Sequence, residues 1–360
     1  MTSLLDIIKD LRIISIPSGN KEFYDNVKTK LNAEGCTYAM SWIMYRHTCP
    51  PECLWHNPTI QDKNGRTLAM HWTMYICMPV PKSFIHDLSE IKDNDGLNLM
   101  MYHVIYVKKL PLEISNPYPV KSCDKHSKTA AMYWIQCVKT LPPREIMHDA
   151  ILGDIYGHTM LMYWIMCVKE KPPSELSHPN NMMDAKNNTL AMLWVQSIMS
   201  LPPPEYMHSQ MLINSEGKTM AFQWIEKWGT LPPKELMHDI RVTDIYGQTF
   251  ASHWIVRTKT LPPKELLLAP DAQEPVNKFT LAMYWIDIVH TMPPKILMHD
   301  PTIQNRIKQT LAMIWIQRVK TDVPKELMHD LSICDEGDHD LAYYWNVYVR
   351  KPLPDYLIQK

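Results

Sequence analysis

A phrase that begins Thr-Leu-Ala-Met-x-Trp-Ile recurs eleven times along this chain. Its first residue, called position 0 of each repeat, falls at Thr37, Thr67, Asn98, Thr129, Thr159, Thr189, Thr219, Thr249, Thr280, Thr310 and Asp340. The intervals are 30 or 31 residues. A period of this length indicates units that bury their apolar faces only by stacking on one another. The sequence therefore predicts a solenoid, whose function must be sought on a surface.

Composition limits the partners of such a stack. The 360 residues carry a formal net charge of -1, so the chain has no basic field to attract nucleic acid or an anionic membrane surface. No apolar run approaches the roughly 18 residues that span a bilayer. The amphipathic start at residues 1–10 does not resemble a signal peptide. We therefore expect a cytoplasmic protein that binds neither nucleic acid nor membrane.

Motifs of catalysis and metal binding are absent from the sequence. The eight cysteines are too sparse for a disulfide scaffold. Cys49 and Cys53 enclose Pro-Pro-Glu, which matches no familiar zinc or redox spacing, and no second pair follows. There is no Gly-rich phosphate loop, no His-Glu-x-x-His and no Gly-x-Ser-x-Gly. These patterns predict no enzyme, no cofactor and no metal site.

The repeat at Thr159 shows the secondary structure expected of every copy. Gly157 suits a tight turn, Thr159 suits a helix N-cap, and apolar residues over 160–169 follow one face of a helix. Pro172 and Pro173 then break that helix and start a second, which can hold only about two turns. Residues 1–34 are expected to form N-terminal capping helices, and residues 35–360 a single elongated domain.

The loop phrase Asp/Asn-x-x-Gly-x-Thr resembles the ankyrin repeat. The fit is best at residues 62–67, 214–219 and 244–249, and the likeness covers about residues 35–350. The period is shorter than the roughly 33 residues of ankyrin, and tryptophan stands where ankyrins place a small alanine. The resemblance implies an all-α, ankyrin-like α-solenoid of about eleven helix-turn-helix repeats, with loops along one edge and a role in binding other proteins.

Two aromatic columns allow both a structural and a functional interpretation. Tryptophan occupies position +5 of every repeat except the third, where it is His103. An exposed ladder could stack bases or peptide aromatics, but the neighbouring apolar positions favour burial between repeats. Histidine occupies position +19 of eight repeats. Stacked helices lie about 8–10 Å apart, too far for a shared metal, so we expect each histidine to bond carbonyls at the end of the short helix.

Positions that vary between repeats are the candidates for partner contact. They are +4, +7 and +8 of the first helix and the loop tips before the turn glycine. The predicted protein-binding residues are Tyr102, Tyr133, Tyr156, Tyr163, Gln223, Glu226, Tyr246, His253, Arg257, Tyr284 and Arg318. An equally open alternative is that the tip tyrosines only cover neighbouring loops.

The sequence thus favours a non-enzymatic protein-protein interaction scaffold. The alternative is an architectural component of a large assembly, such as a cytoskeletal or ciliary lattice, where the solenoid would act as a spacer or clamp. The two differ in behaviour, because a scaffold should be soluble when expressed alone, whereas a lattice component should co-fractionate with its lattice. The partner protein is not identified by the sequence.

Overall fold

The computed structural model describes residues 28–85, 90–111, 119–177, 179 and 182–357. The predicted capping helices within residues 1–34 lie almost entirely outside this range. The described residues contain eleven α-helices and no strand longer than an isolated β-bridge. None of these helices is long and apolar enough to cross a membrane. The chain divides into an N-terminal unit, residues 1–185, and a C-terminal unit, residues 186–360.

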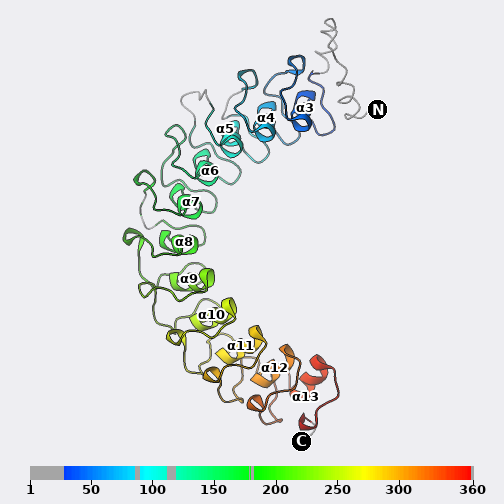
Figure 1. Cartoon of the computed structure of the whole chain (residues 1–360), viewed down its shortest axis with the longest axis vertical. Helices are drawn as coiled ribbons and strands as arrows, with labels where there is room; N and C mark the ends of the chain where they lie inside the picture. The colour runs from blue at the N-terminus through cyan, green and yellow to red at the C-terminus, as the bar shows by residue number, and fades with distance from the viewer. Residues whose placement is uncertain (1–27, 86–89, 112–118, 178, 180–181, 358–360) are drawn as a thin grey trace. The chain divides into compact units, whose positions relative to one another are not determined.

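Each repeat contributes one α-helix, and helices adjacent in sequence contact one another within each unit (Figure 1). The N-terminal unit contains α3 (Tyr38–Arg46), α4 (Leu68–Ile76), α5 (Leu99–Tyr102), α6 (Ala130–Cys137) and α7 (Met160–Cys167). The C-terminal unit contains α8 (Leu190–Ser197), α9 (Met220–Trp228), α10 (Phe250–Thr258), α11 (Leu281–Val289), α12 (Leu311–Arg318) and α13 (Leu341–Tyr344). Two π-helical segments, η3 (His103–Val107) and η9 (Trp345–Val349), extend α5 and α13. This serial packing confirms a helical, solenoid-like repeat.

The helices begin where the threonine caps predict. Thr189 has extended backbone angles, and its hydroxyl accepts a hydrogen bond from the backbone N–H of Met192 at 3.2 Å. Asn98 and Asp340, which replace threonine in two repeats, accept the same bond through their side-chain oxygens. A cap of this kind satisfies a helix N–H that has no intrahelical partner.

Where the structure describes it, the second helix of the repeat is shorter than predicted. After the Pro-Pro break the chain forms a single three-residue 3₁₀ turn, as at η4 (Ser174–Leu176), and Ser177 then returns to an extended conformation. The other such turns are η1 (Glu52–Leu54), η2 (Lys82–Phe84), η5 (Pro204–Tyr206), η6 (Lys264–Leu266), η7 (Lys295–Leu297), η8 (Lys325–Leu327) and η10 (Asp355–Leu357). One turn is enough to bury the residue at position +17, such as Leu176. The predicted helix-turn-helix pair is therefore a helix followed by a turn.

The tryptophan column lies in the core, as the apolar spacing predicts. Eight of its ten members are buried, and Trp42 and Trp254 are partly exposed. In seven repeats the indole Nε1 donates to a threonine or serine hydroxyl six residues later, as from Trp224 to Thr230 at 3.0 Å. In these seven repeats the threonine or serine after the helix is thus an acceptor for the indole N–H.

Trp164 lacks this hydrogen bond from the indole to a hydroxyl, so it can be used to measure what the bond contributes. It is buried, but residue 170 is glutamate, and the Trp164 Nε1 has no hydrogen-bond partner among the described residues. An unsatisfied buried donor destabilises the folded state. We expect Glu170→Thr to raise the free energy of unfolding by about 1 kcal/mol, measured by urea denaturation. The matched control is Thr140→Val, which should lower it by a similar amount. An unchanged midpoint in Glu170→Thr would contradict this account.

Candidate protein-binding surface

In six repeats an aspartate in the loop before the helix ties that loop to the helix. Before α7, Asp154 Oδ1 accepts hydrogen bonds from the backbone N–H groups of Tyr156 and His158, both at 2.9 Å. Its Oδ2 accepts one from the hydroxyl of Tyr163, the +4 residue, at 2.8 Å. The same pairing joins Tyr102 to Asp93, Tyr133 to Asp124, Tyr344 to Asp335, His71 to Asp62 and His253 to Asp244. Position +4 therefore belongs to the framework of the repeat.

Six predicted binding residues occupy position +4, and the structure places them in or against the core. Tyr102, Gln223, His253 and Tyr284 are buried, and Tyr133 and Tyr163 are half-buried. The premise that this position is free of the framework is wrong. Tyrosine and histidine alternate at this position in six repeats because both can donate to the same loop carboxylate. Burial and the bond to Asp154 raise the pKa of the Tyr163 hydroxyl, so it stays a donor.

The side chain at position -1 can link consecutive repeats by contacting the +4 tyrosines. The Lys128 ammonium lies 4.3 Å from the ring centroid of Tyr133 in its own repeat and 4.5 Å from that of Tyr163 in the next. In the C-terminal unit Gln309 Nε2 donates to the hydroxyl of Tyr344, one repeat later, at 2.7 Å. We call positions -5, -1 and +4 together the polar ladder. It connects successive helices through side chains on the loop side of the core.

The histidines at position +19 bond carbonyls, as predicted, and also contact the hydroxyl of the threonine at position 0. His238 Nδ1 bonds the carbonyl of Asp239 at 3.0 Å, and its Nε2 lies 2.8 Å from the hydroxyl of Thr219. Because the carbonyl can only accept, Nδ1 carries the proton and Nε2 accepts from threonine. Five further pairs are Thr37–His56, Thr129–His148, Thr189–His208, Thr280–His299 and Thr310–His329. His86 and His178 lie outside the described residues.

Four of the predicted binding residues come together at one cavity in the C-terminal unit. Glu226, Tyr246, His253 and Arg257 line a space of about 420 Å³, with Lys218, Asp244, Gln248 and Val256. Lys218 Nζ lies 2.8 Å from a carboxylate oxygen of Glu226 and 2.9 Å from one of Glu216, so its charge is compensated. Within the described residues Arg257 forms no ion pair, and its guanidinium lies 3.5 Å from the carbonyl of Lys227. The cavity therefore presents an exposed cation beside an exposed aromatic ring.

The loop tips form a row next to this cavity. Tyr246 is 59% exposed and the preceding Ile245 is 55% exposed. Backbone hydrogen bonds join successive tips, since Ile245 N–H donates to the Glu216 carbonyl and Arg306 N–H to the Asn277 carbonyl. Tyr156 occupies the same place in the N-terminal unit, 52% exposed and stacked on His126. At Tyr156 and at Ile245 and Tyr246 the tips therefore present exposed apolar groups.

Arg318 is the last of the predicted residues. It is exposed on α12, and its Nε lies 2.5 Å from a carboxylate oxygen of Asp287 on α11. It does not line the cavity around Arg257. This ion pair bridges two consecutive repeats at positions +7 and +8.

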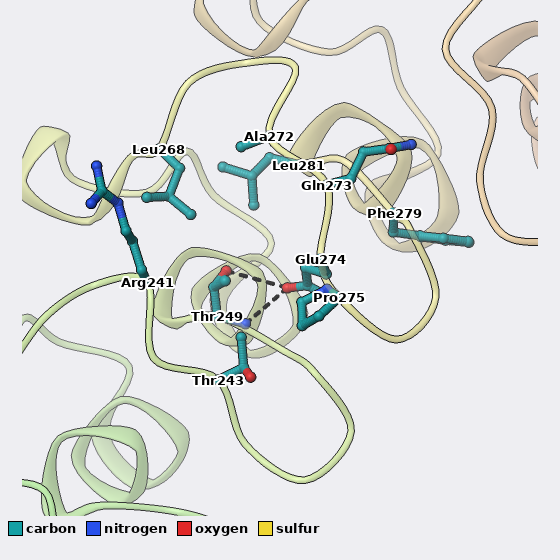
Figure 2. A pocket seen from close by; sticks show the side chains of 10 residues that line it. All are labelled: Arg241, Thr243, Thr249, Leu268, Ala272, Gln273, Glu274, Pro275, Phe279 and Leu281. Atoms are coloured by element: carbon teal, nitrogen blue, oxygen red, sulfur yellow. Dashed lines mark hydrogen bonds between the residues drawn. The ribbon is translucent and has the colours of Figure 1, made fainter.

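A second cavity in the C-terminal unit was not predicted. It has a volume of about 230 Å³ and is lined by Glu274, Thr249 and Leu268, among others (Figure 2). Leu268 stands where other repeats have the +19 histidine, and here the Glu274 carboxylate accepts from the hydroxyl of Thr249 at 3.2 Å and from its backbone N–H at 2.8 Å. The sequence signal was the simultaneous loss of histidine at 268 and gain of glutamate at 274.

Comparison with known proteins does not assign a family to this chain. No protein-family model matches the chain, and no curated protein matches it.

Proposed function

We propose that this protein is a non-enzymatic scaffold that binds a partner protein at the loop tips and the adjoining cavity of the C-terminal unit. The observation that supports this is the grouping of Tyr246 and Arg257, both exposed, around one cavity. Aromatic and arginine side chains beside a cavity are the groups that dominate the affinity of protein interfaces. The bonded tip backbone reduces the ordering cost of binding.

The charges of the cavity suggest what a partner segment presents there. Lys218 is compensated by two glutamates, whereas the Arg257 guanidinium keeps donors for a ligand. A carboxylate could accept two parallel hydrogen bonds from this guanidinium. The exposed faces of Ile245 and Tyr246 suit an apolar side chain next to that carboxylate. The expected ligand is therefore a protein segment with an acidic residue beside a large apolar one.

We expect Tyr246→Ala and Arg257→Ala each to weaken the partner's binding about 10- to 100-fold. The partner would first be captured from the native cell on the full-length chain, and its dissociation constant then measured for each variant. Tyr45→Ala is a control, because Tyr45 is 61% exposed at the end of α3 in the other unit. Equal binding by all variants would contradict this site. Recovery of the chain only with a sedimenting polymer would favour the architectural role instead.

A further inference from the structure

The polar ladder changes its chemistry at the first two helices of the N-terminal unit. Cys36 is position -1 of the first repeat, counted from Thr37. Asp62 and His71 are positions -5 and +4 of the second repeat, counted from Thr67. His71 Nε2 lies 3.0 Å from Asp62 Oδ2, and Cys36 Sγ lies 3.9 Å from the same oxygen. The sulfur, the imidazole nitrogen and a carboxylate oxygen all lie within 4.8 Å of one another, and all three residues are buried.

Two other steps of the ladder have lysine instead of cysteine at position -1. The step around Asp154 combines it with Lys128 and Tyr163, whose ammonium and phenol groups are already paired. The step around Asp244 has the same aspartate-histidine pair as the first, at 3.0 Å, but position -1 is Lys218. Among the described residues, the trio at Cys36 is the one group that places three metal-ligating side chains together.

A second observation at the same step is an unpaired buried hydroxyl. Ser41 is 0% exposed, and its Oγ has no hydrogen-bond partner among the described residues. Ser41 is the +4 residue of the repeat to which Cys36 is position -1. Lys128, at position -1 elsewhere, lies against the +4 ring of its own repeat and the +4 ring of the next. By the same register Ser41 occupies the position that faces position -1 in the repeat of Lys128, which makes its hydroxyl a candidate to complete the cluster.

We propose that Cys36, Asp62 and His71 bind a divalent zinc ion, with the Ser41 hydroxyl or a water as the fourth ligand. Thiolate, imidazole and carboxylate are the ligands that zinc takes, at bond lengths of about 2.0–2.3 Å in a tetrahedron. Those bonds place ligand atoms roughly 3.3–3.8 Å apart, close to the separations seen here. The ion would join α3 to α4 across the interface of two repeats.

Binding requires a defined transfer of protons. Burial, and then the neighbouring Asp62, raise the pKa of the Cys36 thiol to about 11, so the thiol is protonated without the ion. Zinc displaces this one proton as the Zn–S bond forms. The His71 proton moves from Nε2 to Nδ1, which is buried and has no partner among the described residues, so that Nε2 can coordinate. No oxidation or reduction takes place.

Cobalt(II) binding to the full-length chain tests the proposal. After treatment with a chelator and a reductant, we expect the protein to take up one equivalent of Co²⁺ with a thiolate-to-cobalt charge-transfer band, and Zn²⁺ to displace it. Cys36→Ser should lose the band and weaken binding at least 10-fold. Cys137→Ser, which changes a half-buried cysteine on α6, should keep both. A band that survives in Cys36→Ser, or no stoichiometric binding by the natural chain, would overturn the proposal.

His71→Tyr separates loss of the metal from loss of the fold. Tyrosine is the usual +4 residue and pairs with the loop aspartate in four other repeats, so this variant should fold. We expect Zn²⁺ to raise the melting temperature of the natural chain and to leave that of His71→Tyr unchanged. An equal rise in both proteins would show that zinc binds elsewhere, and the proposal would then be wrong.

Discussion

Glu274→Ala is expected to destabilise the protein by about 3–5 kcal/mol. One carboxylate oxygen of Glu274 accepts from the backbone N–H of Thr249 at 2.8 Å, from its hydroxyl at 3.2 Å and from the hydroxyl of Ser252 at 2.6 Å. The other oxygen accepts from the Tyr284 hydroxyl at 2.6 Å. The side chain is buried, so alanine would leave several donors unsatisfied at once. Urea denaturation of both chains measures the loss.

A variant that restores the usual residues of the repeat is the control for this prediction. Leu268 and Thr249 both line the cavity beside Glu274, so a histidine at 268 has room to approach the Thr249 hydroxyl (Figure 2). The double variant Leu268→His with Glu274→Asp restores the residues found in neighbouring repeats. We expect it to recover most of the stability that Glu274→Ala loses. A double variant as unstable as Glu274→Ala would show that the carboxylate does not substitute for the histidine.

Acidification from pH 7 to pH 4 is expected to destabilise the protein through its buried histidines. Burial lowers the pKa of His103 to about 4, and it also lowers the pKa of the histidines paired with the threonine caps, namely His56, His148, His238 and His299. Their pKa in the unfolded chain is about 6.5, so the unfolded chain binds more protons below that pH. Their contribution is therefore complete above about pH 6.5 and is lost as the pH falls. For His103 alone it amounts to about 3 kcal/mol.

Other groups titrate with a different sign or in a different range. Burial raises the pKa of the Glu274 carboxyl, so protonation of that group favours the folded state and opposes the histidines. Burial raises the pKa of Asp62, but hydrogen bonds from His71 and the loop backbone outweigh it and lower the pKa overall. Aspartates with a lowered pKa lose their stabilising contribution only below about pH 4. The slope between pH 6.5 and pH 4 therefore reports mainly on histidine.

His103→Leu isolates the largest histidine contribution. His103 is buried, and its Nδ1 has no hydrogen-bond partner among the described residues. A leucine of similar volume removes a buried polar group that titrates. We expect urea midpoints measured from pH 7 to pH 4 to fall less steeply for this variant than for the natural chain. Parallel curves would contradict the assignment of the slope to His103.

The period and its spacing were sufficient to predict the elements that depend on local chemistry. In eight repeats the threonine at position 0 caps the helix because its hydroxyl reaches an N–H three residues later, which needs no tertiary contact. Apolar residues around Trp164 share one helix face for the same local reason. The bond from histidine to the next carbonyl is local too. These features were read correctly from single repeats.

The length of the second helix and the role of position +4 depended on contacts between segments. The +19 histidine of each described pair contacts the threonine at position 0 of its own repeat, as His238 contacts Thr219, and the repeat with Leu268 at this position has the same single turn, η6. The residue type at position +4 varies between repeats, which indicated an exposed surface. At Tyr163, however, the hydroxyl at this position donates to Asp154 in the preceding loop. Variability in a sequence does not distinguish a free surface from a shared bonding partner.

The sequence by itself determined that this chain is a stack of capped helices whose tryptophans form the core, because those features repeat with local spacing. Only the tertiary structure decided which side chains meet. It buried Tyr102 and Tyr284, gathered Tyr246 and Arg257 at one cavity, and brought Cys36 to Asp62 and His71. Cys36 and His71 lie 35 residues apart, on either side of a repeat boundary. Their approach follows from how one helix packs on the next, which no spacing within a single repeat specifies.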